Sequence, residues 1–402
     1  MQNDAVLLIT LGALLILSPL VRNLMARISL PAPVGYIVLG FLISTLDYQW
    51  NFIDRTFENV FSVLAELGVV ALLFRVGLRS NLEALIAKLP DASLIWVGDV
   101  LANLLVGFTL AYYLLDLSLA TALIIATAFS ATSVAVSVTI WDELDLLNSA
   151  TGTLLIDVAE LDDLSGVLLL TIVLAILPVL QAGEAGLLGA ASATAMLTVL
   201  KLIFFVGICY VFSRYLEEDF TRFNRDLSGD GTALVITILG TGLALSAFAE
   251  LLGFSLAIGA LFAGLAFSRD PNVIRNEGRF TLYYEFFAPF FFIHIGMQVD
   301  PAAFMVGADT GLLLAGAAAA AKVIGVMIPA LLLLNKADAL VLGVSMIPRA
   351  EIALLVVYQC SQLGDELISP EIFAGIVLTS ILTSIVAPPL VRFLLLRQGW
   401  DK

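Results

Sequence analysis

Long apolar segments, separated by short polar ones, follow one another along the whole chain. A helix of roughly 20 mostly apolar residues crosses the hydrocarbon core of a bilayer. With 60% hydrophobic and only 13% charged residues, the chain cannot cover the surface of soluble domains, which carry about 25% charged residues. The sequence therefore predicts an all-α polytopic membrane protein with about thirteen transmembrane helices, at residues 5–26, 31–46, 57–78, 92–115, 118–140, 149–178, 187–213, 231–251, 253–268, 280–299, 309–334, 338–362 and 370–396.

The remaining composition excludes several classes of protein. The formal net charge of −15 argues against a nucleic-acid partner, because phosphate binding requires clustered Lys and Arg. The two cysteines, Cys209 and Cys360, lie inside apolar runs, and there is one histidine, so neither a disulfide framework nor a His-based metal site is expected. The acidic N-terminus does not resemble a cleaved signal peptide. We expect no cofactor, and a lipid bilayer as the environment.

The Lys and Arg residues predict the orientation of the helices. Cytoplasmic loops of membrane proteins carry an excess of these residues. With the predicted spans and the N-terminus outside, most of the nineteen Lys and Arg residues fall on the cytoplasmic side. The sequence thus predicts a multi-pass protein of the cell (inner) membrane with an external N-terminus and a cytoplasmic C-terminus.

Four acidic residues crowd into the predicted span 149–178. At about 100° per residue, Asp157, Glu160 and Asp163 form one stripe of this helix, while Asp162 points to a different face. Ionisable groups at membrane depth are costly, and they commonly mark ion pathways. The alternative is a frayed helix end whose acids are solvated, but apolar residues continue on both sides.

Lys322 is the one charge in the apolar segment 311–334, and it lies near the middle. A lysine held at this depth needs a counter-ion. The acidic helix is the natural source, and we expect an ion pair between Lys322 and Asp162. The alanines around Lys322 would allow neighbouring helices to approach closely.

Two other predicted spans contain polar interruptions. One has Ser130, Thr132 and Ser133 at its middle, and the other has Pro348, Arg349 and Glu351. Proline removes a backbone hydrogen bond and disfavours helix at the preceding residue. Discontinuous helices in corresponding halves of a transporter indicate a binding site at the membrane midplane. An inverted repeat would bring both interruptions, the acidic helix and Lys322 together.

Seven segments, taken in order, resemble the Kef-type family of bacterial monovalent cation/proton antiporters, and most closely its Na⁺/H⁺-exchanging members. The similarity covers nearly the whole chain. The segments are LPAPVGYIVLGFLIS (30–44), LAELGVVALLFRVGLRSNLEAL (64–85), SATSV (130–134), ELDDLSGVLLL (160–170), GFSLAIGALFAGLAFS (253–268), FFFIHIGM (290–297) and IPRAEIALLV (347–356).

The resemblance implies roles for individual residues. Asp163 matches the carboxylate that binds the cation or the proton. Asp162 matches its neighbour, which pairs with a lysine in electrogenic members, and Lys322 matches that lysine. Thr132 and Ser133 stand where the unwound helix offers oxygen atoms to the ion. Two further residues, Arg349 and Glu351, match a charged pair whose role is structural rather than transporting.

The resemblance also implies an architecture. It is an inverted-repeat antiporter fold with two crossed broken helices, in which a core domain slides against a dimerisation domain within a homodimer. The expected core comprises residues 91–178 and 309–397, the expected scaffold residues 1–90 and 231–300, and the expected linker helix residues 187–213. No soluble regulatory domain is expected.

Asp157 and Glu160 stand where the family usually has small or apolar residues. Together with the acidic loop residues Asp142, Glu143 and Asp145, they could form a negative entrance that concentrates cations. Alternatively, Asp157 and Glu160 hydrogen-bond within the core, for example to Lys201 or Arg75. The two interpretations carry equal weight.

The expected function is therefore exchange of Na⁺, and also Li⁺, for H⁺, with electrogenic exchange and a role in pH homeostasis. The first alternative is a K⁺/H⁺ antiporter, which the pair Asp162–Asp163 disfavours because K⁺-specific members often carry an amide there. A cation channel and an intramembrane aspartyl protease are distant alternatives. The protease needs two aspartates that face each other, whereas these two diverge by about 100° on one helix.

Overall fold

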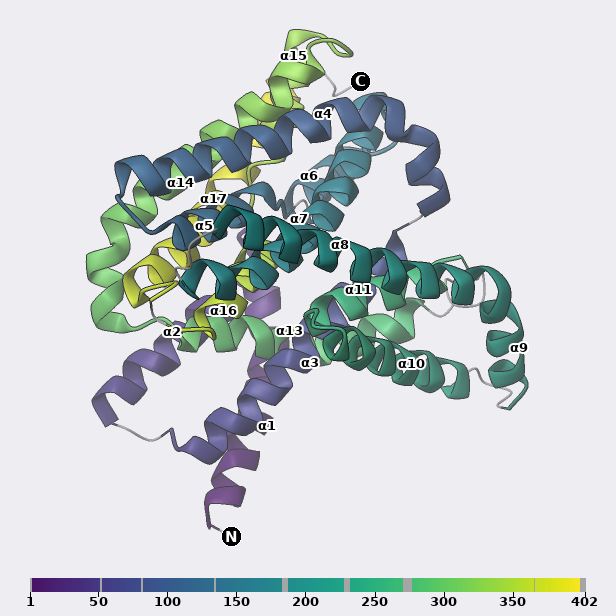
Figure 1. Cartoon of the computed structure of the whole chain (residues 1–402). Coiled ribbons are helices and arrows are strands. Elements are labelled where there is room, and N and C mark those ends of the chain that lie inside the picture. Colours follow the sequence, from purple (N-terminus) through teal and green to yellow (C-terminus); the bar gives the residue numbers. More distant parts are fainter. Residues whose placement is uncertain are drawn as a thin grey trace. The chain divides into compact units, whose positions relative to one another are not determined.

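The computed structural model describes residues 2–50, 53–80, 82–133, 135–182, 187–227, 232–269, 277–364 and 366–397, and the regular elements within them are helices (Figure 1). They are α1 (Gln2–Arg27), α2 (Ala32–Trp50), α3 (Arg55–Arg79), α4 (Leu82–Thr109), η1 (Leu110–Leu114), α5 (Leu119–Ser130), α6 (Ala135–Glu143), α7 (Ala150–Ala182), α8 (Leu187–Val211), η2 (Phe212–Leu216), α9 (Glu217–Leu227), α10 (Thr232–Leu251), α11 (Leu256–Phe267), α13 (Glu277–Met297), α14 (Pro301–Ala330), α15 (Lys336–Ser345), α16 (Glu351–Ser361) and α17 (Pro370–Arg397).

The helices have the lengths that a membrane protein requires. In the described part of the chain, eight helices are long and apolar enough to cross a membrane. Three shorter apolar helices, α5, α11 and α16, lie within predicted spans. The prediction of an all-α membrane protein is confirmed. Every predicted span falls on one helix or on an interrupted pair, and the number thirteen stays a prediction.

The chain divides into two compact units. The first contains residues 1–57, 88–170 and 292–402, and the second contains residues 58–87 and 171–291. All four boundaries between the units fall inside helices, within α3, α4, α7 and α13. The predicted division into scaffold, core and linker concerns which parts move together, and it stays a prediction. All candidate site residues lie in the first unit.

Two spans of the first unit are broken in the middle, as predicted. The first, α5–α6, has extended backbone at Ala131. The second, α15–α16, is interrupted by Met346–Ala350, where Pro348 cannot donate a backbone hydrogen bond. Both interruptions leave backbone amides and carbonyls without helical partners, and such groups must be satisfied by other groups inside a membrane.

Glycines allow α14 to approach α4 closely. A Cβ atom at Gly325 would lie 2.7 Å from the Cβ of Ala102 and 3.1 Å from the Cα of Asp99. A Cβ atom at Gly98 would lie 3.0 Å from the carbonyl oxygen of Gly325. Small residues permit such backbone contact between membrane helices. The contact places Lys322, on α14, beside the polar face of α4.

Candidate functional site

The two interrupted helices cross at their breaks. The Ser133 amide donates a hydrogen bond to the Pro348 carbonyl at 2.8 Å. On one side of the breaks, the Ser137 hydroxyl donates to the Ser345 carbonyl at 2.6 Å, and Trp141 Nε1 donates to the Ser345 hydroxyl at 3.0 Å. These bonds join α5–α6 to α15–α16 and satisfy groups that the interruptions expose. The crossing therefore holds the side chains around it in fixed positions.

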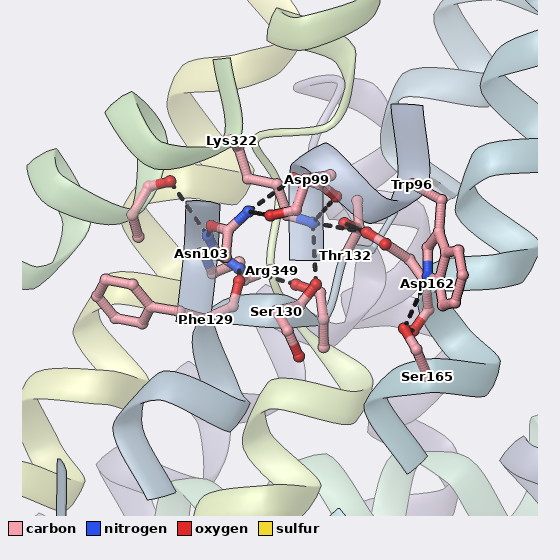
Figure 2. Close-up of polar contacts among 12 residues, drawn as sticks. Trp96, Asp99, Asn103, Phe129, Ser130, Thr132, Asp162, Ser165, Lys322 and Arg349 are labelled. Atoms are coloured by element: carbon pink, nitrogen blue, oxygen red, sulfur yellow. Dashed lines mark hydrogen bonds and ion pairs between the residues drawn. The ribbon is translucent and has the colours of Figure 1, made fainter. Parts of the chain in front are cut away.

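Lys322 lies between two carboxylates beside this crossing (Figure 2). Its Nζ atom is 2.6 Å from Asp162 Oδ2 and 2.5 Å from Asp99 Oδ2, and it also donates to the Ser130 carbonyl at 2.9 Å. All three charged side chains are fully buried. The three donors of the ammonium group are thus matched by three acceptors. The predicted ion pair between Lys322 and Asp162 is present, and a second carboxylate shares it.

The two oxygen atoms of Asp162 have different surroundings. Oδ2 accepts hydrogen bonds from Lys322 and, at 2.5 Å, from the Thr132 hydroxyl. Oδ1 is buried and accepts a hydrogen bond from no described residue. The Ser165 hydroxyl donates to the Asp162 main-chain carbonyl at 3.0 Å and accepts from Trp96 Nε1 at 3.1 Å, which fixes this turn of α7 (Figure 2).

Arg349 binds the interruption of α5–α6 to α4 and α14. Its guanidinium donates to the Phe129 carbonyl, to the Ala131 carbonyl at 2.9 Å, to Asn103 Oδ1 at 2.8 Å and to the Ala318 carbonyl at 3.1 Å. The side chain is buried. Glu351, which together with Arg349 matches a charged pair of the family, is not among these four acceptors.

Asp163 lies on a different face of α7 from Asp162. Asp162 is fully buried, whereas Asp163, like Asp157 and Glu160, is half-buried. The Asp163 carboxylate makes no hydrogen bond or ion pair with another described residue. Glu351, Asp162 and Glu160 act on it as like charges, and Lys322 acts on it as the opposite charge. Asp163 is therefore a carboxylate at the crossing that no cationic side chain neutralises by direct contact.

The remaining predicted residues are more dispersed. Glu351 begins α16 and is half-buried. Of the acidic loop residues, Glu143 forms an exposed ion pair with Arg392 at 3.5 Å, so part of that negative charge is neutralised. Lys201, a suggested partner of Asp157 and Glu160, donates instead to the Leu252 carbonyl at 3.2 Å, within the other unit.

Two residues of the site, Asp99 and Asn103, are not among those predicted from the sequence. Both are fully buried, and Asn103 Nδ2 donates to Asp99 Oδ1 at 2.6 Å. The signal was present, because Asp99 is an acidic residue inside the apolar segment LIWVGDVLANLLVGF, and Asn103 follows it one helical turn later. The rule that selected the acids of α7 applies equally to Asp99.

Comparisons with known proteins agree with this architecture. The high-affinity Na⁺/H⁺ antiporter NhaS3 of Synechocystis sp. is 26% identical over 369 residues, which cover 90% of this chain and 78% of that protein. The Na⁺/H⁺-K⁺ antiporter GerN of Bacillus cereus is 25% identical, covering 95% of this chain and 94% of that protein. The structure of the sodium proton antiporter MjNhaP1 from Methanocaldococcus jannaschii at pH 8 superposes with a TM-score of 0.72 at 15% identity, covering 98% of this chain and 97% of that one, so the two share a fold.

A family model described as "Sodium/hydrogen exchanger, transmembrane" matches residues 12–397, which is nearly the whole chain. The match agrees with the polytopic helical fold and with the buried charges at the crossing of two interrupted helices. It makes the chain a transporter rather than an enzyme, which removes the aspartyl protease from consideration. The chain belongs to the transmembrane sodium/hydrogen exchanger family.

Proposed function

We propose that this protein exchanges Na⁺ for H⁺ across the membrane by alternating access, and that Li⁺ is a further cargo of the same site. The observation that carries the proposal is the pair of adjacent aspartates at the crossing of two interrupted helices. Asp162 and Asp99 share the Lys322 ammonium, whereas Asp163 has no cationic contact among the described residues. A carboxylate without a cationic contact can be neutralised by either of two monovalent cations, H⁺ or Na⁺.

Competition for Asp163 would couple the two ions. A proton and Na⁺ cannot both neutralise the same carboxylate, so binding of one releases the other. The empty, charged site resists crossing the membrane, because moving an unpaired charge through a medium of low dielectric constant is costly. Na⁺ would bind the Asp163 carboxylate with oxygen atoms of Thr132, Ser133 and the unpartnered Oδ1 of Asp162, as unwound helices coordinate ions in other transporters.

The electrogenic cycle implied by the resemblance adds a second proton. In that cycle, Na⁺ draws Asp162 away from Lys322, and the lysine, which then has one carboxylate fewer beside it, releases its proton. Two protons would then move against one Na⁺, and each net charge that crosses is worth about 2.3 kcal/mol per 100 mV of membrane potential. The buried contact between Lys322 and Asp162 supports this proposal.

The finer assignments form part of the same proposal. The seven motifs and the Lys322–Asp162 pair support placement in the Kef-type branch of these transporters. We further propose a homodimer in the cell (inner) membrane with an external N-terminus, in which the core slides against the scaffold. K⁺/H⁺ exchange is the second candidate function, because the name of GerN, a relative over nearly its whole length, includes K⁺.

The test is ion-driven proton movement in vesicles that contain the purified protein. An imposed proton gradient quenches an acid-sensitive dye, and Na⁺, Li⁺ and K⁺ are added in turn. We expect Na⁺ and Li⁺ to restore the fluorescence and protein-free vesicles to show no response. Recovery with K⁺ and none with Na⁺ would establish the second candidate, and no recovery with any of the three would refute the proposal.

A further inference from the structure

We infer that Asp99 is a positioning residue for ion exchange. It holds the Lys322 ammonium in place when the Asp162 carboxylate turns to a transported cation. The inference rests on the proposed function, and it assigns a role to a residue of α4 that takes no direct part in the two-aspartate scheme.

The contacts of Lys322 are the first observation that supports this role of Asp99. Its Nζ atom contacts Asp99 Oδ2 at 2.5 Å and Asp162 Oδ2 at 2.6 Å, so the two carboxylates share the ammonium almost equally. The Ser130 carbonyl accepts the third hydrogen bond at 2.9 Å. When Asp162 moves away, two of the three contacts of Lys322 remain, and one of them is a full counter-charge.

The second observation is that the carboxylates of Asp99 and Asp162 differ in how they are held. Both oxygens of Asp99 are engaged, because Oδ2 contacts Lys322 and Oδ1 accepts from Asn103 Nδ2 at 2.6 Å. Asn103 is itself held, since it donates to the Asp99 carbonyl at 2.8 Å and accepts from Arg349 at 2.8 Å. Asp162 keeps one buried oxygen without a described partner. Asp99 is therefore the fixed counter-ion, and Asp162 is the one that can exchange partners.

Competition for Asp162 follows from this asymmetry. In the native protein, a cation that recruits Asp162 leaves Lys322 with Asp99. Without the Asp99 charge, Asp162 becomes the one carboxylate in contact with Lys322, and the cation must compete with an ammonium that has no other partner. A buried charge that loses its partner is strongly disfavoured. Loss of Asp99 should therefore weaken cation binding rather than slow the turnover of the bound protein.

The variant Asp99→Asn tests the inference, since it removes the charge while it keeps the shape and the contact with Asn103. Two quantities are measured: the KM for Na⁺ and the maximal rate in vesicles, and the apparent Na⁺ Kd from thermal stabilisation of the purified protein, because a bound ligand raises Tm. We expect KM and Kd to rise at least about tenfold, which corresponds to about 1.4 kcal/mol, with a small change in maximal rate. Asp309→Asn, on the exposed side of α14, is the matched control and should leave both unchanged.

A double variant separates positioning from the general electric field of Asp99. In a Lys322→Gln background there is no ammonium to hold, so Asp99→Asn should change the apparent Na⁺ Kd by less than about twofold, compared with the tenfold expected in the native background. A tenfold effect that persists in this background would overturn the inference in favour of a long-range field.

Two further results distinguish the remaining outcomes. If Asp99→Asn does not fold, Asn103→Ala keeps the charge of Asp99 and removes its support, and it should raise the Na⁺ KM by a smaller factor. If the variant that folds has an unchanged KM for Na⁺ and differs from the native protein only in its lower yield of folded protein, Asp99 has a structural role. That result would overturn the inference. Failure of the native protein to respond to Na⁺ at all would instead refute the proposed function.

Discussion

The Ser133 amide donates a hydrogen bond to the Pro348 carbonyl at 2.8 Å, so each of the two interruptions supplies a backbone hydrogen-bond partner to the other. Pro348 creates the second interruption, and its carbonyl is an acceptor left without a helical donor. The first interruption offers the matching donor. Since neither group has water available at this depth, the crossing should be a rigid body. The proposed ion site lies at this crossing, and the hydrogen bonds of the Arg349 guanidinium stabilise it further.

Arg349→Lys should destabilise the protein severely. The guanidinium reaches four acceptors from three elements, and a lysine ammonium cannot reproduce that planar arrangement. Buried carbonyls left without donors cost about 1–3 kcal/mol each, so we expect a loss of at least about 3 kcal/mol. Thermal unfolding in detergent measures it. Arg392→Lys is the control, because its ion pair with Glu143 is exposed and such pairs contribute about 0–1 kcal/mol. Equal Tm values for the two variants would contradict the assigned role.

Lys322→Ala should cost more stability than the loss of an ordinary ion pair. It leaves two buried carboxylates, Asp99 and Asp162, without their shared cation. Removing one partner of a buried pair typically costs about 3–5 kcal/mol. Adding Asp162→Asn should recover part of the loss, and adding Asp99→Asn as well should recover more. Strictly additive losses in this series of Tm measurements would show that the three side chains do not interact.

Gly325→Ala should push α4 away from α14. The new methyl group would lie 2.7 Å from the Cβ of Ala102, which has no rotamer to move aside. Overpacking typically costs about 1–3 kcal/mol, and it would also lengthen the Lys322–Asp99 contact. Gly316→Ala on the same helix meets no atom within 4 Å, and it should be neutral or gain up to about 1 kcal/mol from helix propensity. A smaller loss at Gly325 than at Gly316 would contradict the close packing of these helices.

Replacing Asp157 with Asn and Glu160 with Gln distinguishes the two interpretations of the acidic stripe. If these residues concentrate cations at the inner entrance, the KM for Na⁺ on the cytoplasmic side should rise at low ionic strength, and the rise should shrink at about 1 M salt, where the Debye length is about 3 Å. The maximal rate should change little. An unchanged KM at low salt, or loss of folded protein, would favour a structural role within the core.

The sequence predicted the parts of the site that can be recognised from patterns along the chain. Apolar lengths located the spans, and polar interruptions located the breaks at Thr132 and Pro348. The counter-ion requirement of a buried lysine predicted the contact between Lys322 and Asp162. The sequence does not show which helices pack against each other. The role of Asp99 became apparent only from its contact with Lys322 on α14. For the same reason, the sequence does not show the partners of Arg349, which lie on α4, α14 and the first interruption.

The central claim is that Na⁺ and H⁺ compete for Asp163, and the most direct measurement is Na⁺-driven proton release by Asp163→Asn in vesicles. The variant is first shown to be folded by a Tm within a few degrees of the native value and by its correct insertion in the vesicle membrane. We predict that the native protein restores the fluorescence of the dye on addition of Na⁺ and that Asp163→Asn does not, because an amide cannot exchange a proton for a cation. Normal Na⁺-driven proton release by the folded variant would contradict the account.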